Sequence, residues 1–428
     1  MSHDDAPARA SGAIGRVTVA TVVAAASGYL VLLLAARDLG AVTYSVFAVF
    51  WAAYGMVTGA QNGQLQETTR ATRAGGDVRH AAARPSSRAR PWLVNSVIGV
   101  ALGAVVVVSS PLWSDRVFTQ DRWLSVLLLA VGVVSFAVYA HLAGALSGAV
   151  SWGAFAALLS TDALIRLVGA VVAVLLGLGL TAFLVITVIG SVSWILLLTW
   201  STAARHAAGL RGDVGTRRFT ANTLTAMAAA AASAILVMGF PVLINATDGV
   251  GDRSDAATLG AVVLAVTLTR APLLVPLNSF QGVLITRFVD HRDRLVAALR
   301  APMVVVAGVG VVGAGAAWLI GPWLLTTIFG ADYRLAGLTV AWLTVGATAL
   351  ALLTVTGAAV LATAAHRWYA AGWWIATIAS IALLLLPVGI DGRVAIALIG
   401  GPVVGMAVHG FGLALRSRPA VVATRDWA

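Results

Sequence analysis

The stretch LVLLLAARDLGAVTYSVFAVF, residues 30–50, contains the pattern that decides the fold. One apolar stretch, 17–36, ends inside it, and a second, 43–60, begins inside it, with Arg37 and Asp38 between the two. Each stretch has about the length that a helix needs to cross the hydrocarbon core of a bilayer, roughly 20 residues. We therefore predict two membrane-spanning helices joined by a short polar turn.

The same alternation of long apolar stretches and short polar segments continues along all 428 residues. Hydrophobic residues make up 60% of the chain and charged residues 11%, whereas about a quarter of a soluble domain is charged. We predict an all-α polytopic membrane protein of about twelve transmembrane helices. The predicted spans are 17–36, 43–60, 92–110, 123–141, 153–175, 180–200, 220–243, 258–280, 302–320, 338–361, 369–388 and 394–414.

The distribution of arginine predicts the orientation in the membrane. All 28 basic residues are arginine, and 20 of them fall in the segments that are cytoplasmic if the N-terminus is inside. Because positive charge concentrates in cytoplasmic loops, we place both termini in the cytoplasm. The absence of lysine and the excess of Ala, Val and Gly are typical of a high-GC genome, so we expect a bacterial cytoplasmic membrane. The arginines assigned to outer segments are Arg37, Arg116, Arg122, Arg253, Arg334 and Arg393.

The net charge of +11 does not indicate a nucleic-acid partner, because the arginines lie in short loops rather than on one folded face. With no cysteine, the chain forms neither disulfides nor thiolate metal sites. We find no phosphate-binding loop, no HExxH and no GxSxG motif, so we expect no cofactor, no metal and no enzymatic activity.

The two halves of the chain resemble each other. Pro111 and Phe118 follow the third predicted span, and Pro322 and Phe329 follow the ninth with the same seven-residue spacing. We predict two six-helix lobes, 1–210 and 211–428. Since six spans return the chain to the same side, the lobes are expected to be parallel repeats related by a pseudo-two-fold axis along the membrane normal, with substrate between them.

Four motifs resemble the polysaccharide flippase branch of the multidrug/oligosaccharidyl-lipid/polysaccharide (MOP) transporter superfamily, whose other branch includes the MATE transporters. Ala41 and Ser45 stand where that branch usually has Pro and Gly. The motifs are Ala36-Arg37-Asp38-Leu39-Gly40 with Tyr44 and Phe47, Ser147-Gly148 through Asp162 and Arg166, Thr269-Arg270-Ala271-Pro272, and Gly321-Pro322-Trp323-Leu324-Leu325 with Phe329 and Tyr333.

The resemblance implies two lobes around a cavity and a lipid-linked anionic saccharide as substrate. The cargo would be a polyprenyl-(pyro)phosphate-linked saccharide, moved from the inner to the outer leaflet for cell-envelope assembly. Membrane lipids, and the glycosyltransferases or polymerase of the envelope, are the other partners that it implies.

Charged residues inside the predicted spans are the first candidates for function, because each costs about 2.5–3.5 kcal/mol to insert. We predict that Arg270, followed by Pro272 in a kinked span, binds a phosphate or acidic sugar with its guanidinium. Asp162 and Arg166 are four residues apart and can pair on one helix face. This pair is either structural, or Asp162 couples transport to protons or sodium while Arg166 contacts substrate.

Polar residues at the cytoplasmic ends of spans are further candidates. Arg16 could meet an entering headgroup, although a positive-inside anchor explains it as well. We predict that Gln64, Asn278 and Gln281 hydrogen-bond the sugar hydroxyls at a cytoplasmic mouth.

Three alternatives remain open from the sequence. A cation-coupled drug antiporter of the same superfamily generally needs intramembrane carboxylates, and the first span has none. An integral-membrane glycosyltransferase or polymerase usually has a substantial external loop, whereas the predicted outer loops are short. A non-transporting scaffold with the same fold is the third.

Overall fold

The computed structural model describes residues 5–77, 88–249, 255–291, 294–363 and 365–416. Side chains are described over the same ranges except for residues 5–14, 75–77, 278–283, 286 and 416. Every regular element in these ranges is a helix, so the all-α prediction is confirmed. The main helices are α1 (Asp5–Asp77), α2 (Pro91–Ser109), α4 (Arg122–Gly148), α5 (Trp152–Leu176), α6 (Gly179–Ile189), α7 (Ser193–Trp200), α9 (Thr216–Val237), α11 (Ala256–Asp290), α12 (Leu295–Phe329), α13 (Gly337–Ala362), α14 (His366–Leu384) and α15 (Ile390–Arg416). Shorter helices are η3 (Ser110–Leu112), α3 (Ser114–Val117), η4 (Gly190–Val192), α8 (Thr202–Ala208) and α10 (Phe240–Ala246).

Ten helices of the described chain are long and apolar enough to cross a membrane. One of them is α1, which contains the first two predicted spans. Helix α14 is not among the ten; it starts with polar and aromatic residues and covers the eleventh predicted span, 369–388, as far as Leu384. Many valines face outward: along α12, Val304, Val305, Val311 and Val312 are each more than half exposed. Such a surface is unfavourable in water and suited to lipid, so the protein is a multi-pass membrane protein.

A single residue breaks α1 into two spans. Gly40 has φ +66° and ψ 167°, a conformation that side chains disfavour, and it lies in the turn predicted between 36 and 43. A tyrosine from the opposite half of the chain supports this turn. Tyr333 is fully buried, donates a hydrogen bond from its hydroxyl to the Ala36 carbonyl at 2.9 Å, and packs edge-on against Tyr44. Two of the sequence motifs are therefore spatial partners around the turn.

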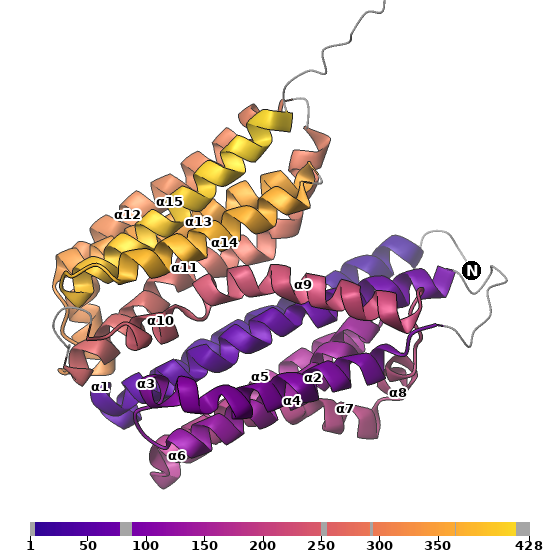
Figure 1. Ribbon diagram of the computed structural model, residues 1–428, viewed down its shortest axis with the longest axis horizontal. Coiled ribbons are helices and arrows are strands. Elements are labelled where there is room, and N and C mark those ends of the chain that lie inside the picture. Colours follow the sequence, from indigo (N-terminus) through magenta and orange to yellow (C-terminus); the bar gives the residue numbers. More distant parts are fainter. Residues whose placement is uncertain (1–4, 78–87, 250–254, 292–293, 364, 417–428) are drawn as a thin grey trace, which may run out of the picture. The chain divides into compact units, whose positions relative to one another are not determined.

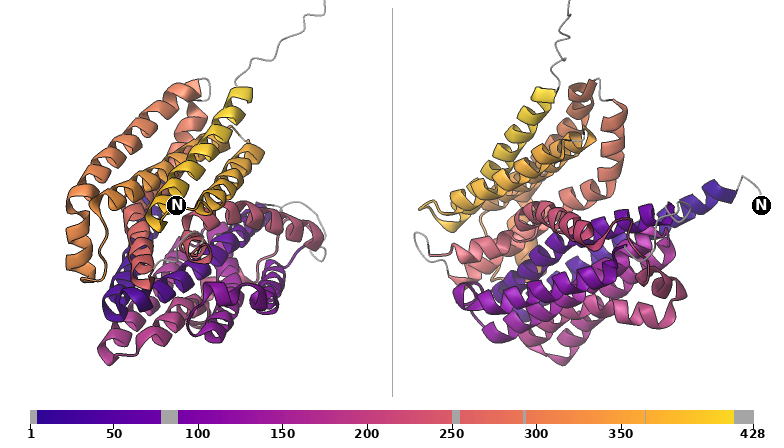
Figure 2. Two further views of the ribbon diagram at one scale, coloured as in Figure 1. Left: turned by 60° about the vertical axis from the view of Figure 1, so that its left-hand side comes forward. Right: turned by 45° about the vertical axis from the view of Figure 1, so that its right-hand side comes forward.

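The described chain divides into two compact units, and each is described by itself (Figures 1 and 2). Unit 1 comprises Met1–Leu264 and Trp323–Leu335. In it α1 packs against α4, α5 and α9, and α2 packs against α4. Its core includes Phe50, Phe118 and Leu184, drawn from α1, the end of α3 and α6.

Unit 2 comprises Ala265–Pro322 and Ala336–Ala428. Its most extensive contacts join α15 to α13 and α14. Small residues make close approach possible there: a Cβ on Gly401 would collide with the Ser380 side chain, and one on Gly405 with α14 and Leu353. The boundary of the two predicted lobes near residue 210 stays a prediction.

The segments predicted to be cytoplasmic meet at one end of unit 1. The Ala89 amide donates to the Val214 carbonyl at 2.8 Å, and the Gly212 amide donates to the Ala89 carbonyl at 3.1 Å. These bonds join the segment before α2 to the segment before α9, and both segments contain arginine. In Figure 1 the end with α8 lies opposite the end with α3, where Asn245 donates to the Arg116 carbonyl.

Asp255 begins α11. Its carboxylate accepts hydrogen bonds from the backbone amide and the hydroxyl of Thr258, each at 2.8 Å. These bonds satisfy a free donor of the first turn and hold the pKa of the Asp255 carboxyl below its usual value, with the backbone bond as the largest cause.

Candidate functional site

The predicted pair on α5 is formed. Arg166 Nη2 donates to Asp162 Oδ1 at 2.9 Å, and each side chain is 16% exposed. Pairing offsets much of the cost of placing either charge in a membrane span. The pair is thus neither sealed in the core nor fully solvated, which leaves both its structural and its functional interpretation open.

Two aromatic rings and one glycine shape the space around Arg166. Its guanidinium carbon lies 5.8 Å from the ring centroid of Trp51 and 5.7 Å from that of Tyr54, both on the second half of α1. Cation–π attraction of this kind is strongest where water is scarce. On the other side η4 approaches so closely that a Cβ on Gly190 would collide with both Arg166 and Asp162. Gly190 is therefore a site residue that sequence reasoning missed.

Arg16 borders an open cavity of unit 1. The cavity has a volume of about 480 Å³ and lies between the beginning of α1 and the first half of α5. Its floor is made of small side chains, and Arg16 and Ser160 are its polar members. The lining residues are Gly15, Arg16, Val19, Ala20, Ala156, Ala157 and Ser160.

The three predicted amide contacts differ in what the structure shows. Gln64 is fully buried, and its amide donates to the Asn95 carbonyl on α2 at 3.4 Å. In this conformation its contacts are therefore inside unit 1, and its role toward sugar hydroxyls stays a prediction. The side chains of Asn278 and Gln281 lie outside the described residues.

Unit 2 holds two buried guanidinium groups. Arg270, on α11 two residues before Pro272, is 6% exposed. Arg393 was assigned to an outer segment, but it is the fourth residue of α15 and only 1% exposed. The helix starts four residues before the predicted span at 394, so Arg393 is buried in its first turn, and the side of the membrane on which it lies stays a prediction.

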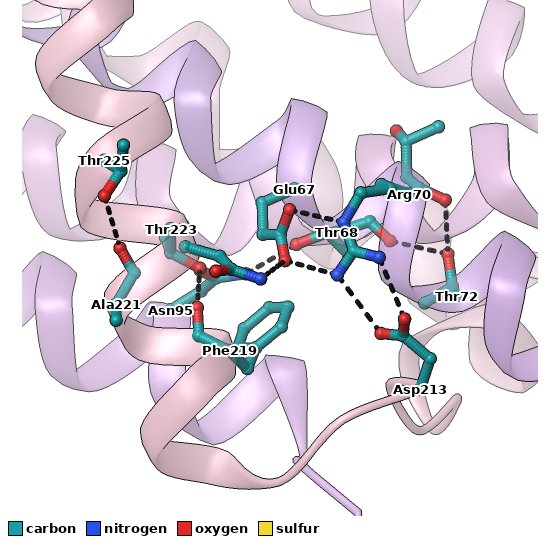
Figure 3. Close-up of polar contacts among 12 residues, drawn as sticks. Glu67, Thr68, Arg70, Thr72, Asn95, Asp213, Phe219, Ala221, Thr223 and Thr225 are labelled. Atoms are coloured by element: carbon teal, nitrogen blue, oxygen red, sulfur yellow. Dashed lines mark hydrogen bonds and ion pairs between the residues drawn. The ribbon is translucent and has the colours of Figure 1, made fainter. Parts of the chain in front are cut away.

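A second ionic site, which sequence reasoning missed, lies at the end of unit 1 that is predicted to be cytoplasmic (Figure 3). Glu67 is the only glutamate of the chain and is 7% exposed. Its carboxylate accepts hydrogen bonds from Arg70 at 2.6 and 2.8 Å and from the Asn222 amide at 3.0 Å. Arg70 also donates to Asp213 at 2.9 and 3.2 Å. We call these four residues the Glu67 network.

The Glu67 network joins distant parts of the chain. It connects the end of α1 to α9 and to the segment before it, across 143 residues between Arg70 and Asp213. A lone glutamate three residues before an arginine was the available sequence signal, but it indicated neither partner beyond the helix.

No family model matches the chain. It is 50% identical over 408 residues to the uncharacterized protein Rv1510 of Mycobacterium tuberculosis strain H37Rv, covering 95% of the chain and 93% of that protein. The chain belongs to this mycobacterial family. A further member, the uncharacterized protein Mb3654 of Mycobacterium bovis, is 47% identical over 400 residues, covering 94% of the chain and 91% of that protein.

The chain has the fold of solved MATE transporters of the MOP superfamily. An inward-facing multidrug resistance MATE transporter matches with a TM-score of 0.70 at 12% identity, over 94% of the chain and 98% of that structure. An outward-facing one matches with 0.64 at 13% identity, over 94% and 95%. A MOP transporter from Pyrococcus furiosus, described as having reversed polarity of its binding pocket, matches with 0.61 at 13% identity, over 95% and 96%.

Proposed function

We propose that the protein is a transporter that flips a polyprenyl-(pyro)phosphate-linked saccharide from the inner to the outer leaflet of the bacterial cytoplasmic membrane. The observation that carries this proposal is the sign of the charge in the membrane. The predicted spans contain three charged residues, of which Arg166 and Arg270 are cations and Asp162 is the anion. A cationic interior favours anionic cargo.

Arginine is suited to phosphate because its planar guanidinium can donate two parallel hydrogen bonds. Arg16 would meet a phosphate at the cytoplasmic entrance, and the mainly apolar lining of the adjoining cavity would face the hydrocarbon chain of the lipid. Arg166 and Arg270 would then replace part of the water around the phosphates on the way across. Asp162 would release or recapture Arg166 as it binds or loses a proton or sodium ion, which is how we propose that transport is coupled.

The MATE fold supports a transporter rather than an enzyme or a scaffold. At 12% identity the similarity establishes only the fold, so the transport function is argued by analogy with the fold. For the Pyrococcus transporter, the reversed polarity of the binding pocket suggests a different function, so pocket charge is informative within this fold. In the present chain the bias is cationic.

A cation-coupled drug antiporter is the second candidate, and Asp162 is the observation that favours it. Its carboxylate is paired with Arg166 at 2.9 Å, so a cationic drug would have to displace the guanidinium first. We therefore rank this candidate below the flippase.

Deletion of the gene and chemical identification of the lipids that accumulate in the inner leaflet test the proposal. We expect one lipid-linked saccharide to accumulate, and complementation by the wild type to clear it. Arg270→Ala and Arg166→Ala should fail to complement, whereas Arg73→Ala, an exposed arginine at the end of α1, should succeed. Accumulation of no such lipid, or full complementation by both variants, would contradict the proposal.

A further inference from the structure

The contact between α1 and α9 is a close seam of small residues. Gly55, Gly59 and Gly63 recur every fourth residue on α1 and face α9. A Cβ on Gly59 would lie 2.7 Å from the Ala234 Cβ, and one on Gly63 would collide with the backbone of Ala226 and Met227. This spacing lets two helix backbones approach closely without interlocked side chains.

The seam ends at the Glu67 network. Glu67 is one helical turn beyond Gly63 and therefore lies on the same face of α1. Its contact with Asn222 joins α1 directly to α9, and the contact of Arg70 with Asp213 joins α1 to the segment that leads into α9 (Figure 3). The polar contacts of Glu67 and Arg70 thus lie at the end of the seam that is predicted to be cytoplasmic.

The two sides of this seam belong to different lobes of the predicted repeat. The end of α1 lies in 1–210, while Asp213 and α9 lie in 211–428. If the lobes rock around a central substrate, the contacts between them must open on one side of the membrane at a time. A smooth seam can part with little steric resistance, so the energy of closure would come mainly from its polar end.

We infer that the Glu67 network is the cytoplasmic closure of the transport path, and that it must break for the cargo to enter. The inference rests on the proposed transport function. Glu67 is the central group because its carboxylate accepts from both Arg70 and Asn222. Hydrogen bonds to a charged group are stronger than those to a neutral one, so losing the charge shifts the closure equilibrium by roughly tenfold or more.

The natural absence of cysteine makes the closure directly measurable. Thr223→Cys places a thiol on α9 beside the network, at a position that is fully buried here. The Thr223 hydroxyl donates only to the Phe219 carbonyl of its own helix, so the substitution breaks no contact between helices. The rate at which a membrane-impermeant maleimide labels it in inverted vesicles reports opening from the cytoplasmic side.

Matched controls separate opening from general loosening. Thr187→Cys on α6 is also fully buried and also donates to its own helix, at the Phe183 carbonyl, but it lies away from the seam. Thr72→Val removes a hydroxyl near the network whose bonds stay within α1. Asn222→Ala deletes one arm of the network and serves as a milder variant should Glu67→Gln fail to assemble.

We expect Glu67→Gln to speed labelling of Thr223→Cys about tenfold or more and Asn222→Ala to speed it by less. Labelling of Thr187→Cys should stay unchanged in both variants, and Thr72→Val should leave both reporters slow. The inference is overturned if Glu67→Gln leaves Thr223→Cys protected, or if both reporters accelerate together, because the network would then be a structural tie. Neither labelling rate depends on cargo. The proposed function is tested separately, by the analysis of accumulated lipids, so failure of one proposal can be told from failure of the other.

Discussion

The described part of unit 1 contains an ion pair within one helix and an ionic network that joins two helices. Asp162 and Arg166 lie on one helix, four residues apart, and each is 16% exposed. The Glu67 network joins α1 to α9 and contains Arg70, which is 46% exposed. A pair within one helix cannot tie two elements together, whereas a network between helices can.

This difference suggests separate tasks. The α5 pair places two opposite charges in a membrane span, where each is costly without its partner, and we propose that Arg166 contacts the anionic cargo there. The Glu67 network lies where the Arg70 side chain is 46% exposed, and we infer that it closes the seam between α1 and α9. Substitutions at the two sites should therefore affect stability, transport and labelling differently.

The largest effect is expected from Arg166→Leu, which leaves the Asp162 carboxylate without its partner in a span. Removing one member of a buried pair costs about 3–5 kcal/mol, whereas replacing both by apolar residues is often near neutral. Asp162→Leu combined with Arg166→Leu should therefore recover most of the stability and still fail to export saccharide. Unfolding in detergent and export by a complemented deletion strain measure the two results. If Arg166→Leu were as stable as the double variant, the ion pair would have no electrostatic role in stability.

The next effect is expected from Gly190→Val, because the new side chain would collide with Arg166 and Asp162. Overpacking of this kind costs about 1–3 kcal/mol and should also reduce export. Gly308→Val is the matched control, since a Cβ at Gly308 on α12 has no atom within 4 Å. Equal melting temperatures for the two valine variants would show that η4 does not confine the pair.

Glu67→Gln should lower the stability of unit 1 by about 1–3 kcal/mol, because a buried carboxylate loses charge-assisted bonds. Thermal unfolding of the purified variant measures the loss. Thr225→Val, which removes an exposed hydroxyl on α9 that donates only to its own helix, should unfold like the wild type. If the Glu67→Gln protein also unfolded like the wild type, the charge-assisted bonds of Glu67 would contribute nothing to stability, and the account of the closure would be contradicted.

The smallest effect is expected from Asp213→Asn. Its partner Arg70 is nearly half exposed, and such pairs contribute about 0.2–1 kcal/mol. Raising the salt concentration should remove most of that difference, because exposed charges are screened within about 10 Å at 0.1 M. The loss caused by Arg166→Leu should depend far less on salt. Melting temperatures at low and high salt compare them, and equal salt dependence would erase the distinction between the two sites.

Local patterns in the sequence predicted much of the fold. Apolar length predicted the spans, the polar residues near Gly40 predicted the break in α1, and four-residue spacing predicted the Asp162–Arg166 pair. Each prediction depends on residues close together in the chain, where helix geometry alone sets the distance.

Contacts between distant residues could not be predicted in this way. The bond from Tyr333 to Ala36 and the bond from Arg70 to Asp213 depend on how helices pack, and no spacing rule covers such separations. The burial of Arg393 was missed for a related reason, since hydropathy places helix ends only to within a few residues.

Binding of an anionic polyprenyl lipid is the most direct test of a cationic transport path. Native mass spectrometry would compare the purified protein with a polyprenyl diphosphate and with the uncharged polyprenol of equal length. The account predicts adducts with the diphosphate, few with the alcohol, and at least about tenfold weaker diphosphate binding after Arg166→Ala or Arg270→Ala. Equal binding of the two lipids, or diphosphate binding that survives both substitutions unchanged, would contradict it.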